Sequence, residues 1–482
     1  MSIKYKTLIA SVFLIIFLIV CLVAQNQGMW LNWLGYVIYL YAVLTWHWEK
    51  NDKIFSLYAI FFTFLLLFNY GDCIMWALGI GLDRGRTVGK ALAYGSSLYM
   101  TEADLLATKW YVCLSMLAFH IGAMLLIKPG KKKAAVVPQG VDVVRIEGDR
   151  KALYYAGAFV SIIVTPIALA LRVKEVIIAM RYGYDALYYG DMSTQSGYVQ
   201  IIIFLFFPAL VAFLIGSNFK KRVVWIVGVI FGVYAILGIA SGDRGSWLYS
   251  LLIFIWLYAQ KHGIKPTTMV KLIILGVIGI YALQVVTLSR DGGLSELTAQ
   301  SFIDAFSTDN SPIVDAFFEM GTTMGIVTIF LKAGAIYPYA NTYLTAILGA
   351  VSSRVMTILG IDFVLIGDWL SQDYFGLNYG LGFSMIAEAY VNGGYLGGLI
   401  YMLVLGGVIG KLLCLCRDNH DMASKPIRSF VAIASANLLM SLPRGAAYLV
   451  VKSFVYGVLV ILVLVYVLRI KTKGKTVRSR VG

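Results

Sequence analysis

Residues 223–259 read VVWIVGVIFGVYAILGIASGDRGSWLYSLLIFIWLYA. Two apolar runs, 223–240 and 246–259, flank the five residues SGDRG, which hold an Asp beside an Arg. A run of about 18 apolar residues is long enough to cross a hydrocarbon core roughly 30 Å thick. The stretch therefore predicts two membrane helices joined by a short charged turn, and a charge at such a position is costly and usually functional.

Similar apolar runs recur along the whole chain. Of its 482 residues, 60% are hydrophobic and only 13% are charged, whereas a soluble domain carries about 25% charged residues. We therefore predict an all-α polytopic membrane protein in which residues 1–482 form a single integral membrane domain. The predicted spans, about twelve in number, are 7–24, 29–46, 54–79, 110–127, 152–171, 199–216, 223–240, 246–259, 271–288, 390–413, 428–441 and 448–468.

The basic residues predict the orientation, because Lys and Arg near helix ends favour the cytoplasmic side. With the N-terminus inside, the inner segments hold 27 of the 40 Lys and Arg residues but only 7 of the 25 Asp and Glu residues. Both termini are thus predicted to be cytoplasmic. The net charge of +15 then reflects topology, and no nucleic-acid partner is expected. The alternative is that the basic stretches KPGKKK and KTKGKTVRSR contact nucleic acid or anionic lipid headgroups.

Three connections on the predicted outer side are long, namely about 80–109, 172–198 and 289–389. Long loops in compact proteins are mostly functional, so the active surface is expected on these extracytoplasmic loops. The apolar pieces TMGIVTIFL and YLTAILGAVSS within 289–389 are short and interrupted. We predict that they form interfacial helices, with two further spans as the alternative.

No metal or cofactor is expected. The five cysteines lie in predicted spans or on the inner side, and CLC followed by RDNH lacks the second Cys pair of a zinc site. The outer carboxylates likewise do not form the paired cluster that holds a divalent ion against phosphates.

The outer side is rich in arginine. Arg forms bidentate, charge-assisted hydrogen bonds with phosphate and stays protonated. Several at helix ends would suit a pyrophosphate at the membrane surface, whereas snorkelling of each Arg to the interface is the alternative. The arginines on the predicted outer side are Arg84, Arg86, Arg172, Arg181, Arg244, Arg290, Arg354 and Arg444.

The outer segments MRYGYDALYYGDMSTQSGY and SQDYFGLNYG interleave Tyr with Asp, Asn, Gln and Ser. Sugars bind to such surfaces because their apolar ring faces stack on aromatic rings while carboxylates and amides take the hydroxyls. We predict carbohydrate contact there, with Tyr189 among the contacting residues. An interfacial aromatic belt is the alternative.

Three motifs carry a resemblance to the Wzy-type polymerases, which join lipid-linked repeat units into O-antigen, capsule or exopolysaccharide. In RVKEVIIAMRYG, Arg172 and Gly183 are separated by ten residues, which is similar to the Arg-x10-Gly pattern of an outer loop in that family. SGDRGSWL resembles its Gly-x-Arg-Gly stretch, and GLGFSMIAEAYVNGGYLGG resembles its late Gly-x-Ser, Glu and Asn-Gly-Gly run. A second Arg-x10-Gly copy is missing from the large loop, where Arg354 is followed by Gly367.

The resemblance implies a GT-C-like fold in a bacterial inner membrane and a metal-independent glycosyl transfer at the extracytoplasmic face. The donor would be a chain on undecaprenyl pyrophosphate, with a chain-length regulator protein as a further partner. Arginines would neutralise the leaving pyrophosphate, with Arg244 and Arg290 nearest the chemistry and Asp243 fixing the Arg244 fork. An Asp243–Arg244 pair that closes a tight interhelical turn is the alternative. The other predicted substrate-binding residues are Arg172, Arg181, Arg354, Arg444 and Asp368.

The acceptor hydroxyl needs a base, and a carboxylate is expected to supply it. The four histidines lie on the predicted inner side or, for His120, within a span, unlike the outer His of the related O-antigen ligases. Glu388 is the first candidate because it stands in the apolar, Gly-flanked run SMIAEAYVNGG. Asp191, Asp368 and Asp373 follow, and a helix-end role for Glu388 is the alternative.

Two other functions fit parts of the pattern. A flippase for lipid-linked oligosaccharides would also have many spans and buried charges, but it would show two similar halves. A ligase that transfers finished polymer shares the outer arginines and differs by its outer His.

Overall fold

The computed structural model describes residues 3–88, 98–128, 141–187, 197–243, 245–263, 311–332, 334–377 and 380–478, with scattered residues between 267 and 281. The chain divides into two compact units. Unit 1 comprises Met1–Lys133, Val314–Arg417 and Leu439–Lys452. Unit 2 comprises Ala134–Ile313, Asp418–Leu438 and Ser453–Gly482.

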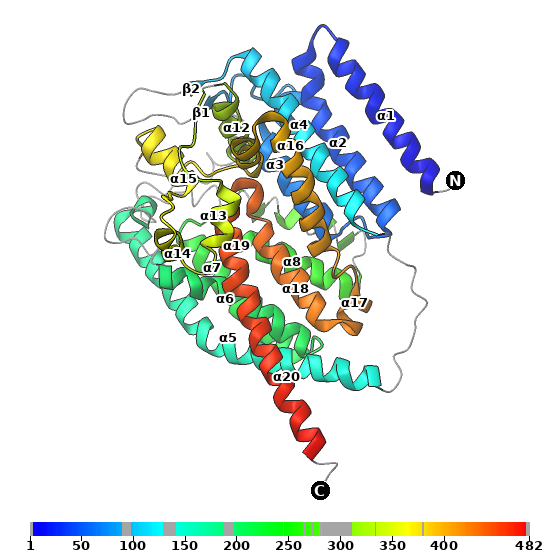
Figure 1. Ribbon diagram of the computed structural model, residues 1–482, viewed down its shortest axis with the longest axis vertical. Coiled ribbons are helices and arrows are strands. Elements are labelled where there is room, and N and C mark those ends of the chain that lie inside the picture. Colours follow the sequence, from blue (N-terminus) through cyan, green and yellow to red (C-terminus); the bar gives the residue numbers. More distant parts are fainter. Residues whose placement is uncertain are drawn as a thin grey trace. The chain divides into compact units, whose positions relative to one another are not determined.

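The first part of unit 1 is a set of long helices that run beside one another (Figure 1). Its elements are α1 (Ile3–Val23), α2 (Gln27–Lys50), α3 (Leu57–Ala77), the paired antiparallel strands β1 (Thr87–Val88) and β2 (Leu98–Tyr99), and α4 (Glu102–Leu126). α3 begins after Ser56, whose hydroxyl accepts the N–H of Ala59, and α4 begins with a capping box between Thr101 and Asp104. These caps satisfy N–H groups that a first helical turn leaves free.

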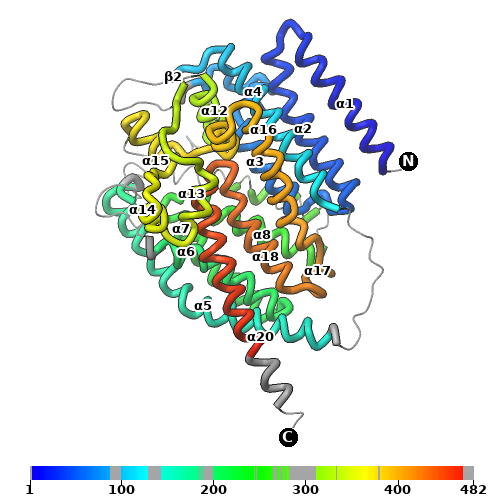
Figure 2. The backbone as a smooth tube through the Cα atoms, viewed as in Figure 1, coloured from blue at the N-terminus to red at the C-terminus, as the bar shows by residue number. Residues whose placement is uncertain are grey.

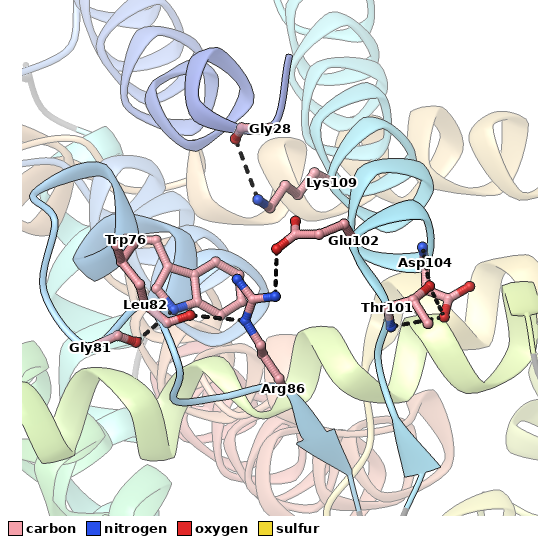
Figure 3. Close-up of polar contacts among 9 residues, drawn as sticks. All are labelled: Gly28, Trp76, Gly81, Leu82, Arg86, Thr101, Glu102, Asp104 and Lys109. Carbon is pink, nitrogen blue, oxygen red and sulfur yellow. Dashed lines mark hydrogen bonds and ion pairs between the residues drawn. The ribbon is translucent and has the colours of Figure 1, made fainter. Parts of the chain in front are cut away.

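The loop after α3 is fastened to unit 1 by ion pairs and carbonyl contacts (Figure 3). Arg86 pairs with Glu102 at the start of α4 and donates to the Leu82 carbonyl. The buried Trp76 donates to the Gly81 carbonyl, and Lys109 lies over the Trp76 ring at 5.0 Å from its centroid. The loop is thus held against the ends of α3 and α4.

The second part of unit 1 contributes one more long helix and several short ones. They are α11 (Pro312–Gly321), α12 (Thr323–Lys332), α13 (Thr342–Leu348), α14 (Arg354–Ile358), α15 (Ile366–Asp368), the π-helix η5 (Trp369–Tyr374), α16 (Met385–Leu413), the 3-10 turn η6 (Leu442–Arg444) and α19 (Ala447–Ser453). α12 is buried from Thr323 to Phe330 and packs against α3, α4 and α16. The core of unit 1 therefore lies where these four helices meet.

α4 and α16 touch along a glycine seam. A Cβ atom at Gly122 of α4 would lie 1.8 Å from the Leu403 carbonyl oxygen of α16, and one at Gly406 would lie 1.9 Å from that of Phe119. Small residues let two membrane helices approach to backbone contact in this way. α16 is also broken at Gly394, whose φ of 62° and ψ of −159° are not helical.

Unit 2 is built around a 42-residue helix that Figure 2 traces in blue-green. Its elements are α5 (Val141–Tyr182), the 3-10 turn η1 (Tyr184–Leu187), α6 (Gly197–Gly216), α7 (Lys221–Ala240), α8 (Ser246–His262), α17 (Asn419–Ser424), α18 (Pro426–Leu439), the π-helix η7 (Phe454–Leu459) and α20 (Val460–Arg478). α5 packs closely on α6, and α20 packs on α5, where Arg469 pairs with Asp149 at 2.8 Å. At about 1.5 Å per residue α5 is roughly 63 Å long, about twice a hydrocarbon core.

Nine helical stretches among the described residues are long and apolar enough to cross a membrane. Eight coincide with predicted spans, and the ninth, Pro312–Lys332, comprises α11 and α12. The protein is therefore polytopic and, apart from one short β-pair, helical. The count of twelve, the GT-C-like fold, the orientation of the termini and the interfacial helices within 289–389 stay predictions.

Four predicted spans are not among the nine. α2 covers 29–46, but its many Trp and Tyr residues lower its mean hydropathy. α8, of 17 residues, covers 246–259, and α18, of 14 residues, covers 428–439 of the predicted span 428–441. The span 271–288 lies largely outside the described residues.

Candidate active site

A pocket of about 220 Å³ lies in unit 1 among α13, α15, α16, η6 and α19. It brings together three of the residues that the sequence singled out, namely Glu388, Asp368 and Arg444. Its aromatic lining residues are Tyr337, Phe363, Phe383 and Tyr448. A carboxylate, a guanidinium and aromatic rings therefore line one pocket.

Glu388 lies one turn into α16 and is fully buried, with 0% of its surface exposed. α16 begins at Ser384, whose hydroxyl accepts the N–H groups of Ile386 and Ala387. One carboxylate oxygen of Glu388 accepts the Thr342 hydroxyl at 2.7 Å, and the other accepts the Ala447 backbone N–H at 2.8 Å. These donors are neutral, and no ion pair of Glu388 is found in the described part of the chain. The carboxylate is thus held in place with half of its lone-pair capacity still open.

Thr342 is itself fixed by Asn392, which stands next to the break in α16. The Asn392 amide donates to the Thr342 hydroxyl and to the Glu388 carbonyl, both at 2.7 Å, and it accepts the Thr342 N–H at 2.8 Å. Asn341 caps α13 by accepting the N–H groups of its first turn. The Asn392 side chain thereby satisfies a carbonyl near the point where the regular helix is interrupted.

Arg444 ends the short turn η6 and lines the pocket. Its guanidinium lies over the Phe68 ring at 5.9 Å from the centroid. Gly382, at φ 75°, lies beside it, since a Cβ atom there would be in ordinary van der Waals contact with Arg444 Nε at 3.5 Å. Within the described residues no ion pair occupies Arg444, so it can attract an anionic group of a ligand.

The pKa values of two other side chains at the pocket are raised. Burial raises the pKa of Tyr337, and the neighbouring Tyr339 and Glu388 raise it further. The phenol is therefore protonated and donates to the Val364 carbonyl, which leaves its ring as the part that a ligand meets. Partial loss of water raises the pKa of Asp368, at the end of α15.

A second buried cluster lies in unit 2 around Arg172. Its guanidinium donates to Glu175 at 2.7 Å, to Asp243 at 2.8 Å and to the Tyr234 hydroxyl at 2.9 Å. Asp243 also accepts the Gly245 N–H at 3.0 Å. The cluster therefore ties α5 to α7 and to the turn before α8.

The remaining predicted site residues do not line the pocket or are not described. Arg181 and Arg354 are exposed. Arg84 pairs with Asp315 at 2.6 Å. The predicted residues that lie outside the described part of the chain are Arg244, Arg290, Asp191 and Tyr189.

Thr342, Asn392 and the Ala447 N–H were not predicted as site groups from the sequence. Asn392 was visible within the quoted run VNGG, but nothing marked Thr342 as its partner 50 residues earlier.

His120 lies buried in unit 1 between Thr45 and Tyr58, at 2.9 Å from each hydroxyl. In the part of the chain that the structure describes, no group of three or more His, Cys, Asp or Glu side chains could hold a metal ion.

The helices and the pocket define a multi-pass membrane protein whose helical core encloses a carboxylate, a guanidinium and several aromatic rings. The family model described as O-antigen polysaccharide polymerase Wzy matches residues 6–475. The chain therefore belongs to this family and is a glycosyltransferase that polymerises lipid-linked repeat units, as its resemblance to Wzy-type polymerases predicted. No curated protein and no solved structure matches the chain.

Proposed function

We propose that the Glu388 pocket is the polymerisation site and that Glu388 is its general base. The acceptor sugar would place a hydroxyl against Glu388, which takes the proton as the oxygen attacks the anomeric carbon of the donor. The bond between that carbon and the pyrophosphate oxygen breaks, and a glycosidic bond forms. The observation that carries this proposal is a buried carboxylate that shares a pocket with a guanidinium and is held by two neutral donors.

Arg444 would stabilise the negative charge that develops on the leaving pyrophosphate. Asp368 would accept sugar hydroxyls, and the rings of Tyr337, Phe363 and Tyr448 would face the sugar ring. The donor would be a chain on undecaprenyl pyrophosphate at the extracytoplasmic face of a bacterial inner membrane, with no metal required. The same proposal includes cytoplasmic termini and a chain-length regulator protein as a partner. It also includes roles in substrate binding or catalysis for Arg172, Arg181, Arg354, Asp243, Arg244, Arg290, Asp191 and Tyr189.

The test is the rate of chain extension on a synthetic undecaprenyl-pyrophosphate oligosaccharide. Glu388→Gln keeps the shape and most hydrogen bonds but removes the base, so the rate should fall roughly 100- to 10,000-fold while the substrate still binds. A Glu388 that only braced Thr342 and Ala447 would predict the reverse pattern. Glu388→Gln would then retain nearly the full rate, and Glu388→Ala would lose folded protein because both donors would be left unpaired.

A further inference from the structure

Asn69 is a buried polar residue in the apolar helix α3, and none of its surface is exposed. Its side-chain amide donates to the Leu65 carbonyl and to the Pro443 carbonyl, both at 3.1 Å. Its side-chain oxygen accepts the Ser384 hydroxyl at 2.7 Å. A polar side chain inside a membrane helix is costly, and these contacts account for the whole hydrogen-bonding capacity of the amide N–H groups.

The two distant partners of Asn69 belong to the two segments that carry the pocket's charges. Ser384 is the N-cap of α16, one turn before Glu388. Pro443 immediately precedes Arg444 in η6. Asn69 therefore bridges the segment of the base to the segment of the cation, although it does not line the pocket.

Two further contacts join the same segments. The Phe383 N–H meets the Arg444 carbonyl at 3.4 Å, and the Ala447 N–H meets the Glu388 carboxylate at 2.8 Å. The first is long, so it constrains the separation weakly. The Asn69 bridge uses bonds of 2.7 to 3.1 Å, shorter than this first contact, and is anchored in the well-packed helix α3, 89% of whose span is buried.

We propose that Asn69 is a positioning residue that sets the spacing and direction of Glu388 relative to Arg444. This role rests on the proposed function of the pocket. Catalytic groups lose effect steeply with misplacement, and about 1 Å can cost on the order of 100-fold in rate. A residue that only held helices together would instead affect the amount of folded enzyme.

The first experiment measures kcat and KM for Asn69→Leu, which keeps the size of the side chain and removes all its hydrogen bonds. We expect kcat to fall about 10- to 100-fold with KM nearly unchanged, since the lost contact acts on transition-state geometry. Thr328→Val is the matched control, because the Thr108–Thr328 hydroxyl pair at 2.9 Å is also buried and also joins two helices of unit 1. Its kcat per folded enzyme should equal that of the unaltered protein.

The second experiment combines Asn69→Leu with Glu388→Gln. If Asn69 acts through Glu388, its effect disappears once the base is gone, so the double variant should be no slower than Glu388→Gln alone. If the rate reductions of the two single variants multiply in the double variant, Asn69 does not act through Glu388. The positioning role would then be overturned, while the role of Glu388 as general base would stand. A Glu388→Gln variant with the full rate would overturn the role of Glu388 as general base, and with it the positioning role of Asn69.

Ser384→Gly provides a second route should Asn69→Leu yield no folded enzyme. It removes the hydroxyl that bonds Asn69, while glycine is an acceptable N-cap for α16. The same fall in kcat is expected, with the same loss of effect in the Glu388→Gln background. A kcat per folded enzyme equal to that of the unaltered protein would overturn the proposal.

Discussion

Glu388 in unit 1 and Arg172 in unit 2 are both buried charged groups in long apolar helices, but their surroundings differ. Glu388 meets two neutral donors and lines a pocket. Arg172 meets two carboxylates and a phenol hydroxyl. A buried charge surrounded by opposite charges is stabilised by its neighbours, whereas one held by neutral dipoles can still change its protonation state when a substrate arrives.

The different surroundings of the two charged groups indicate different roles for the two regions. Arg172 joins α5 to the turn between α7 and α8, so its ion pairs hold elements of unit 2 together. Arg444, which no described ion pair occupies, is the better placed arginine for binding an anion. The predicted pyrophosphate-binding role of Arg172 stays a prediction.

The largest expected effect comes from removing the Arg172 guanidinium. Arg172→Met removes a cation that Glu175 and Asp243 share at partly buried positions, which should lower the free energy of unfolding by about 3–5 kcal/mol. Thermal unfolding in detergent measures this, with Glu388→Gln as the matched change of a buried charge in unit 1, expected to shift the midpoint far less. An Arg172→Met protein as stable as the unaltered one would remove the contrast between the two regions.

A smaller effect is expected from Thr342→Val, which keeps the shape of the side chain and removes one donor to Glu388. A hydrogen bond to a charged group contributes about 1.5–3 kcal/mol, so the extension rate should fall roughly 10- to 100-fold. Steady-state rates on the lipid-linked oligosaccharide measure this. An unchanged rate would show that the Thr342 bond does not orient the carboxylate.

Asp243→Asn should have a milder effect, because the amide oxygen can still accept from Arg172, while the charge and the acceptor of the Gly245 N–H are lost. If Asp243 only orders this turn, we expect about 1 kcal/mol less stability and an unchanged rate per folded enzyme. The two measurements are thermal unfolding and the extension rate. A large loss of rate with unchanged stability would instead support the predicted role of this turn in pyrophosphate binding.

The smallest effect is expected from a chelator. If Arg444 supplies the positive charge at the pocket, EDTA should leave the extension rate unchanged, because no divalent ion bridges protein and phosphates. A loss of rate in EDTA that magnesium or manganese restores would contradict this.

The apolar helices were predictable because each depends on a local run of residues. Eight predicted spans coincide with helices that can cross a membrane. Spans within 289–389 were predicted only as the alternative to interfacial helices, because Gly, Pro and Lys332 interrupt the apolar pattern there. Glu319 and Lys332 of this stretch are exposed and Asp315 pairs with Arg84. The sequence does not show such a pairing partner 231 residues away.

The candidate site was predictable only in part for the same reason. Glu388 stood out because a carboxylate interrupts an apolar run, but its donors lie 46 and 59 residues away. Asp243 was paired in the sequence with the adjacent Arg244, whereas its described partner is Arg172, 71 residues earlier. Pairings at such separations arise from helix packing, which local patterns do not encode.

The glycine seam between α4 and α16 has a consequence for biosynthesis. Gly122 and Gly406 are 284 positions apart, and at roughly 5–20 residues per second a ribosome needs about 15–60 seconds to make the intervening chain. During that interval α4 is already made while its backbone-contact partner does not yet exist. The small-residue face of α4 must then meet lipid, another helix or an insertion factor, so a chain that stops before α16 would present this face to the quality-control proteases of the membrane.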